Sequence, residues 1–240
     1  MKYKVSPELL MDRLRILYSR AHSVWHLGSC PRAYNVKRVG GAVVASQIED
    51  LLAEFIYANL EKKGLRVFIN PTINIHDGGK ARKPDILICR KIGKNEFQLV
   101  HVVEVKADTG YMRTRKGIAK CLRSAIGLCK RIERERSFSL RLNNETYNVS
   151  VVPPAKIDLV VMTAANNTTV NLESVCEEVW LCSDDRLKMD VLTNECLFDH
   201  KRPKRSARPL KDWFNKMMNR VEQSEERAYS TTFSETLPTR

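Results

Sequence analysis

Two apolar segments, close together in the chain, constrain its fold more than any other feature. They span residues 84–89 and 99–106, and a polar stretch separates them. Their β-branched content and flanking turn residues predict two antiparallel strands of a hairpin. The first segment nevertheless carries Asp85, and the second carries Glu104 and Lys106. A fold built on this hairpin must therefore accommodate three charged side chains in an otherwise apolar sheet.

The spacing of these residues predicts that they converge. If residues 93–96 form the turn, antiparallel pairing places Asp85 opposite Glu104, with Cβ atoms about 4.5–5.5 Å apart. Side chains alternate along a strand, so Glu104 and Lys106 share one face. Two adjacent carboxylates repel each other and lose hydration unless a cation compensates them, and oxygen ligands suit a hard ion such as Mg²⁺. The alternative is a turn residue at Asp85 and an exposed Glu104–Lys106 pair on an edge strand.

Pro84-Asp85 followed by Glu104-Val105-Lys106 resembles the signature of the PD-(D/E)xK nuclease superfamily, the restriction-endonuclease-like proteins. The resemblance implies that Asp85, Glu104 and the carbonyl of Val105 bind Mg²⁺, for which Mn²⁺ can substitute. It also implies that Lys106 activates the attacking water or contacts the phosphate. Whether this lysine is a base or an electrostatic clamp stays open.

In this superfamily an acidic residue on the helix before the sheet often completes the metal site. Glu49 and Glu54 are the candidates here. We favour Glu49 as a fourth catalytic and metal-binding residue, because it follows the apolar Ile48 near the start of a predicted helix. An ordinary solvent-facing glutamate is the alternative, since helix starts favour acidic residues through the helix dipole alone.

The net charge of +13 is concentrated in two stretches. Residues 111–136 carry nine Lys/Arg against two acidic residues, and residues 201–220 carry eight against one. Such clustering predicts a polyanionic partner, with solvated helix faces as the alternative. Residues 201–205 also resemble a nuclear address. The candidate DNA-binding residues are Arg113, Arg115, Lys116, Lys120, Arg123, Lys201, Arg202, Lys204 and Arg205.

Periodicity predicts an α/β fold in which helices flank a mixed sheet. The resemblance implies a restriction-endonuclease-like core with helical elaborations at both ends. We expect four parts: an N-terminal helix and basic loop (1–41), the nuclease core (42–185), a C-terminal basic segment and helix (186–222), and a disordered tail (223–240). Within the core, strands are expected at 65–69, 73–75, 138–142, 147–151, 157–162 and 178–182, besides the hairpin. Helices are expected at 42–63 and 113–135, and the last helix begins at Pro209.

These features together predict a Mg²⁺-dependent endonuclease that cuts double-stranded DNA at a specific sequence, most like a type II restriction enzyme. A homodimer is expected, because two sites related by a two-fold axis cut both strands. The alternatives are a repair, recombination or mobile-element endonuclease that recognises DNA structure or ends, and a non-catalytic nucleic-acid-binding protein. No apolar run approaches a membrane span of about 20 residues. We therefore expect no membrane partner and a cytoplasmic, DNA-associated protein.

Overall fold

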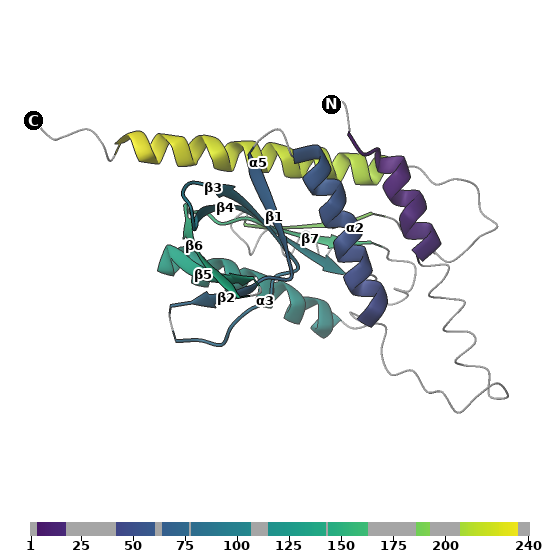
Figure 1. The fold of residues 1–240 in the computed structure, drawn as a ribbon. Helices are drawn as coiled ribbons and strands as arrows, with labels where there is room; N and C mark the ends of the chain where they lie inside the picture. Colours follow the sequence, from purple (N-terminus) through teal and green to yellow (C-terminus); the bar gives the residue numbers. More distant parts are fainter. Residues whose placement is uncertain are drawn as a thin grey trace, which may run out of the picture.

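The computed structural model describes residues 4–17, 42–60, 64–76, 78–106, 115–142, 144–162, 186–192 and 207–234. An eight-stranded mixed β-sheet lies at the centre, with helices on both faces (Figure 1). This architecture confirms the expected α/β class in which helices flank a mixed sheet. The helices are 7–17, α2 (Ala42–Leu60), α3 (Arg115–Glu135) and α5 (Arg208–Ser234). The strands are β1 (Leu65–Ile69), β2 (Thr72–Ile75), β3 (Ile86–Lys91), β4 (Glu96–Lys106), β5 (Ser137–Leu142), β6 (Glu145–Val151), β7 (Ile157–Val161) and β8 (Leu187–Val191).

The sheet branches at β4, its longest strand. Strand β3 pairs with β4 antiparallel along one side. On the other side, the first half of β4 pairs in parallel with β6, and the second half pairs in parallel with β7, which leads to β8. The main path runs β1-β3-β4-β6-β5-β2. Two halves of one strand therefore hold two different sheet extensions, and the charged end of β4 lies on the β7 side.

The chain turns a corner between β1 and β2. These strands are consecutive, yet they lie at opposite ends of the main sheet path, so the sheet must curl. Asn70, which links them with Pro71, has a φ of 49°. Asparagine tolerates this left-handed region better than most residues, and proline supplies no N–H to continue a ladder. This Asn-Pro pair therefore allows the abrupt change of direction.

The predicted hairpin is confirmed, and its register depends on two local irregularities. Ile86 pairs with Val103 and Ile88 with His101, which is the register predicted from the sequence. Nearer the turn, Lys91 pairs with Phe97, one residue out of that register. A β-bulge at Val100 of β4 absorbs the difference, because two residues of β4 there oppose one of β3. The apolar run in residues 100–105 reflects cores on both faces of β4, because Val100, Val103 and Val105 join one core and Val102 joins the other.

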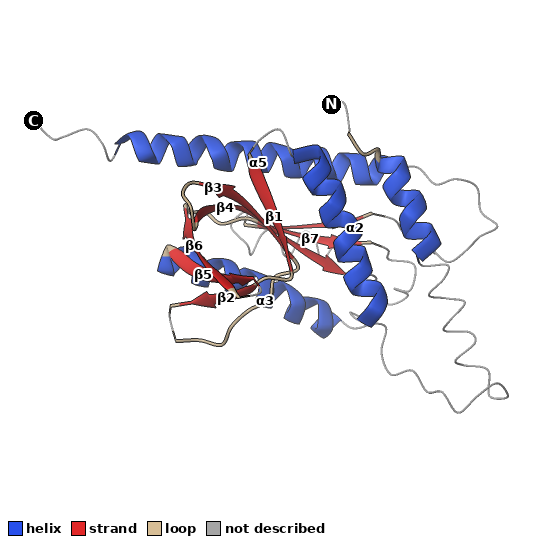
Figure 2. Cartoon of the chain, in the orientation of Figure 1, coloured by secondary structure: helices blue, strands red, loops and turns tan. Residues whose placement is uncertain are grey.

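Each face of the sheet has its own hydrophobic core. Helix 7–17, α2 and α5 pack on one face, and α3 packs on the other (Figures 1 and 2). The buried residues of the first core include Ile48, Phe55 and Ile56 of α2 and Trp213 and Phe214 of α5, all at most 1 % exposed. The rings of Phe55 and Phe214 meet edge to face, with centroids 4.9 Å apart. Both terminal helices thus belong to the core of this domain.

A buried ionic cluster fastens α5 to the sheet. Arg220 of α5 donates to Asp158 of β7, and His101 Nε2 of β4 lies 3.3 Å from the other oxygen of that carboxylate. All three side chains are at least nine-tenths buried. Burial by itself would raise the pKa of Asp158, but His101 and Arg220 hold it below its ordinary value. The sequence analysis did not identify this cluster.

Two expected boundaries at the C-terminal end are wrong. Strand β8 pairs with β7, so the sheet continues beyond residue 185, where the sequence analysis ended the core. Helix α5 continues to Ser234, whereas a disordered tail was expected from residue 223. Extending an existing helix is far less costly than nucleating one, and residues 222–228 are mostly good helix formers. The expected strand at 178–182 lies outside the described residues.

No helix within the described ranges combines the length and the apolar character needed to cross a bilayer.

Candidate active site

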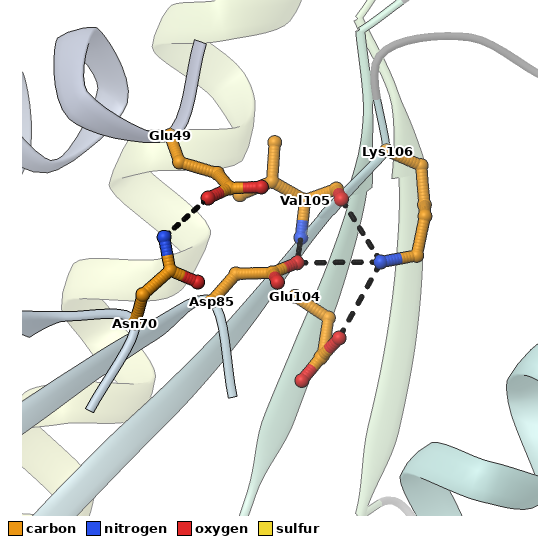
Figure 3. Close-up of polar contacts among 6 residues, drawn as sticks. All are labelled: Glu49, Asn70, Asp85, Glu104, Val105 and Lys106. Atoms are coloured by element: carbon orange, nitrogen blue, oxygen red, sulfur yellow. Dashed lines mark hydrogen bonds and ion pairs between the residues drawn. The ribbon is translucent and has the colours of Figure 1, made fainter. Parts of the chain in front are cut away.

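Three oxygen atoms at the end of the hairpin converge on one ammonium group (Figure 3). Lys106 Nζ lies 3.3 Å from Asp85 Oδ2 and 3.4 Å from Glu104 Oε2, and it donates to the carbonyl of Val105 at 3.0 Å. The backbone N–H of Val105 donates to Asp85 Oδ2 at 2.7 Å. The structure therefore brings together Asp85, Glu104, Val105 and Lys106, which the sequence analysis selected.

The hairpin geometry explains this convergence. The β3–β4 register, continued by one residue from Ile86 and Val103, places Asp85 opposite Glu104. Because side chains alternate, Glu104 and Lys106 share with Val102 the face covered by α3, whereas Asp85, just before β3, accepts the Val105 N–H at the edge of the hairpin. Val103 and Val105 project to the opposite face, where they join the core under α2 and α5. Charged and apolar residues of β4 thus separate onto two faces of one strand.

The site is half-buried, which strengthens the interactions among its charges. The side chains of Asp85, Glu104 and Lys106 are 15 %, 20 % and 28 % exposed. Burial, together with the charge of Asp85, raises the pKa of Glu104 from 4.5 to about 7, against the opposing effect of Lys106. One ammonium therefore compensates the two carboxylates only in part. A site with this electrostatic deficit favours a further cation.

Glu49 approaches the same site from α2. Its carboxylate accepts a hydrogen bond from Asn70 Nδ2 at 2.6 Å (Figure 3). Burial raises the pKa of Glu49; the hydrogen bond from Asn70 opposes this rise, and the charge of Asp85 adds to it. Glu54, the other candidate, is 54 % exposed and pairs with Arg13 of helix 7–17 at 3.0 Å. Of the two glutamates on α2, Glu49 is the one whose charge interacts with Asp85 and Lys106.

Asn70 is a residue of this site that the sequence analysis missed. Its side chain holds Glu49, and its backbone N–H donates to the carbonyl of Asp85 at 2.8 Å. Asn70 therefore connects the helix α2 side of the site to the hairpin side. The signal in the sequence was the Asn-Pro pair between two short strands, which marks a turn whose side chain is available for local hydrogen bonds.

The candidate DNA-binding residues are described only in part. Lys120 and Arg123 are exposed on α3, the helix that follows β4 in the sequence. Arg115 and Lys116 begin the same helix. The remaining candidates, which are Arg113, Lys201, Arg202, Lys204 and Arg205, lie outside the described residues.

The donor set fits a hard divalent cation. Asp85, Glu104 and the Val105 carbonyl already surround one positive group, and all three contribute oxygen, the ligand atom that Mg²⁺ prefers. Within the described ranges, no three His, Cys, Asp or Glu side chains form a ready-made metal cluster. Here two carboxylates and one backbone carbonyl supply the three oxygens, so three protein ligands are available without a third acidic side chain. Glu49 is near enough to Asp85 for the two charges to interact, but in this arrangement it does not complete a three-carboxylate group with Asp85 and Glu104.

Comparisons with family models, with curated proteins and with solved structures identify no significant match to this chain.

Proposed function

We propose that this protein is a Mg²⁺-dependent endonuclease that hydrolyses phosphodiester bonds of double-stranded DNA. The observation that carries the proposal is the convergence of Asp85, Glu104 and the Val105 carbonyl on Lys106 Nζ. Hydrolysis of a phosphodiester needs positive charge beside the phosphate and a positioned, activated water. Three oxygen ligands and an adjacent lysine in a half-buried site supply the protein's part of both requirements.

The order of elements also supports the proposal. Helix α2, strands β1, β3 and β4, helix α3 and strand β7 follow one another, and β1-β3-β4-β7 are neighbours in the sheet. This order resembles the common core of the PD-(D/E)xK nucleases. The strands β2, β5 and β6 and the helices at both ends are then additions to that core.

Each residue of the site has a distinct role in the proposed reaction. Asp85, Glu104, the Val105 carbonyl and Glu49 would hold the Mg²⁺ ion. When bound, such an ion stabilises negative charge on the phosphate and acidifies water. Lys106, which is partly exposed, is positioned to contact the phosphate or the attacking water. Asn70 positions the Glu49 carboxylate through its 2.6 Å hydrogen bond.

Plasmid cleavage in the presence of Mg²⁺ tests the proposal. We expect wild-type protein to cut supercoiled plasmid DNA, and D85N, E104Q and K106A to lose at least about 100-fold in rate, as removal of one preorganised charged group typically costs. E49Q should be impaired, whereas E54Q on the same helix is the matched control and should cut normally. A protein that leaves DNA intact with both Mg²⁺ and Mn²⁺, or site variants that cut like wild type, would contradict the proposal.

The products also discriminate among kinds of nuclease. Discrete bands that reflect double-strand cuts support sequence-specific cleavage by a dimer. Preference for branched or end-bearing substrates instead indicates an enzyme that recognises DNA structure. The same preparations therefore determine both whether the protein cuts and what it recognises.

A further inference from the structure

A short basic loop leads directly into the candidate active site. Lys80, Arg82 and Lys83 lie between β2 and β3 and are all exposed. From here on, the name basic loop refers to these three residues and not to the loop expected within residues 1–41. Within the part of the chain that the structure describes, none of the three takes part in an ion pair. Figure 2 shows this segment among the loops (tan) that connect the strands. Three positive charges without an ion-pair partner among the described residues thus precede Asp85 by at most five residues.

The backbone holds this loop in a defined position. Ile73 N donates to the carbonyl of Arg82 at 2.8 Å, and Arg82 N donates to the carbonyl of Ile73 at 2.9 Å. Ile73 is 1 % exposed and belongs to the core under α3. Two residues after Lys83, the Asp85 carbonyl accepts from Asn70 N at 2.8 Å. The exposed cations are therefore carried by backbone that is tied to the sheet on both sides.

Chain geometry keeps Arg82 and Lys83 close to the site. Lys83 is two residues from Asp85 and Arg82 is three, and a chain spans at most about 3.6 Å per residue. Their Cα atoms are thus within about 7 and 11 Å of the Asp85 Cα. A phosphate held beside Lys106, next to the proposed metal ligands Asp85 and Glu104, would place its neighbours on the same strand within reach of long basic side chains.

We propose that the basic loop binds the DNA backbone next to the bond that is cut. This inference rests on the proposed function and names a substrate contact for it. Charge complementarity is the reason: exposed lysine and arginine side chains favour a polyanion, since each phosphate contact releases condensed counterions. Such contacts position the duplex over the site and carry no base specificity.

The other end of strand β3 offers a matched control. Lys91 and Lys94 lie near the hairpin turn, and both are exposed. Lys91 is six residues along the strand from Asp85, which corresponds to about 20 Å. K91Q/K94Q therefore removes two positive charges, as K80Q/K83Q does. Both pairs of lysines are exposed, but Lys91 and Lys94 lie at the far end of the hairpin.

The test is binding of a fluorescent 30-base-pair duplex in EDTA, measured by anisotropy at several KCl concentrations. We expect K80Q/K83Q to weaken binding about 10- to 100-fold at 50 mM KCl, and to make the slope of log Kobs against log salt shallower by about 2. K91Q/K94Q should keep the wild-type slope. Urea denaturation checks that both variants remain folded, as expected for exposed substitutions.

Two results would overturn the inference: wild-type binding by K80Q/K83Q, or an equal loss in K91Q/K94Q, which would reflect net charge alone. Plasmid cleavage separates this from failure of the proposed function. If wild type cuts DNA and K80Q/K83Q cuts and binds equally well, the proposed DNA contact of the basic loop is wrong and the proposed nuclease activity is supported. If wild type does not cut but only the basic-loop variant loses duplex binding, the loop contact stands and the nuclease is wrong.

Discussion

Replacing Glu104 by glutamine should make the metal-free protein more stable at pH 8. The carboxylate of Glu104 is held beside Asp85 in a half-buried position, and its pKa is raised from 4.5 to about 7. Above pH 7 the folded protein must therefore keep this group ionised at a cost. A neutral amide of the same shape avoids that cost and leaves Lys106 with two other partners, Asp85 and the Val105 carbonyl.

The magnitude follows from the size of the pKa change. A rise from 4.5 to about 7 corresponds to roughly 3 kcal/mol at 1.36 kcal/mol per pKa unit. Solvent reaches the 20 % exposed side chain and screens part of this electrostatic cost. We therefore expect the free energy of unfolding of E104Q to exceed that of wild type by about 1–3 kcal/mol at pH 8. The loss of cleavage and the gain of stability in one variant would reflect a site whose charges are kept for function.

The sign of the pH dependence follows from proton binding. Between pH 4.5 and 7 the folded protein retains a proton on Glu104 that the unfolded chain has released. Stability conferred by this group is therefore fully present below pH 4.5 and is lost as the pH rises through about 7. At pH 5 the folded protein keeps Glu104 protonated, so E104Q and wild type should differ little.

Urea denaturation in EDTA at pH 5 and pH 8 measures the effect, with E54Q as the control for loss of an exposed glutamate. The difference between E104Q and wild type isolates Glu104 from the other groups that titrate, such as Glu49. Addition of Mg²⁺ at pH 8 should stabilise wild type and not E104Q, because ligand binding to the folded state adds to its stability. A lower midpoint for E104Q at pH 8, or the same difference at both pH values, would refute the reasoning.

Three further substitutions test the surrounding structure by urea denaturation. N70A should lower the free energy of unfolding by about 1–3 kcal/mol, because alanine lacks both the side-chain hydrogen bond to Glu49 and the tolerance of asparagine for positive φ. N70G should lower it by less, because glycine tolerates positive φ, but should impair cleavage as much as N70A. Equal stability of the two would contradict the role of φ. D158A should lower the free energy of unfolding by about 3–5 kcal/mol because it removes the buried partner of the Arg220 guanidinium, whereas K216A, at a 62 % exposed position, should lower it by less than about 1 kcal/mol. F214A should cost about 3–5 kcal/mol, and a smaller loss would mean that α5 contributes little to the core.

Much of the site was readable from sequence because its parts are local. The hairpin, with Asp85 on one strand and Glu104 and Lys106 on the other, needs only strand periodicity and a turn to predict its pairing. The predicted register holds at Ile86 and Val103 only because the turn is one residue out and the bulge at Val100 restores it. Two errors of opposite sign cancelled, and no pattern in the sequence indicated that they would.

The sequence by itself indicated most of the helices and strands and which three charged residues should meet, because these depend on neighbours along the chain. Only the tertiary structure decided that Glu49 rather than Glu54 lies beside them, that Asn70 joins helix to hairpin, and that β8 extends the sheet. It alone revealed the cluster of His101, Asp158 and Arg220. These features arise from contacts between residues far apart in sequence, whose energies outweigh the local preferences that a single sequence displays.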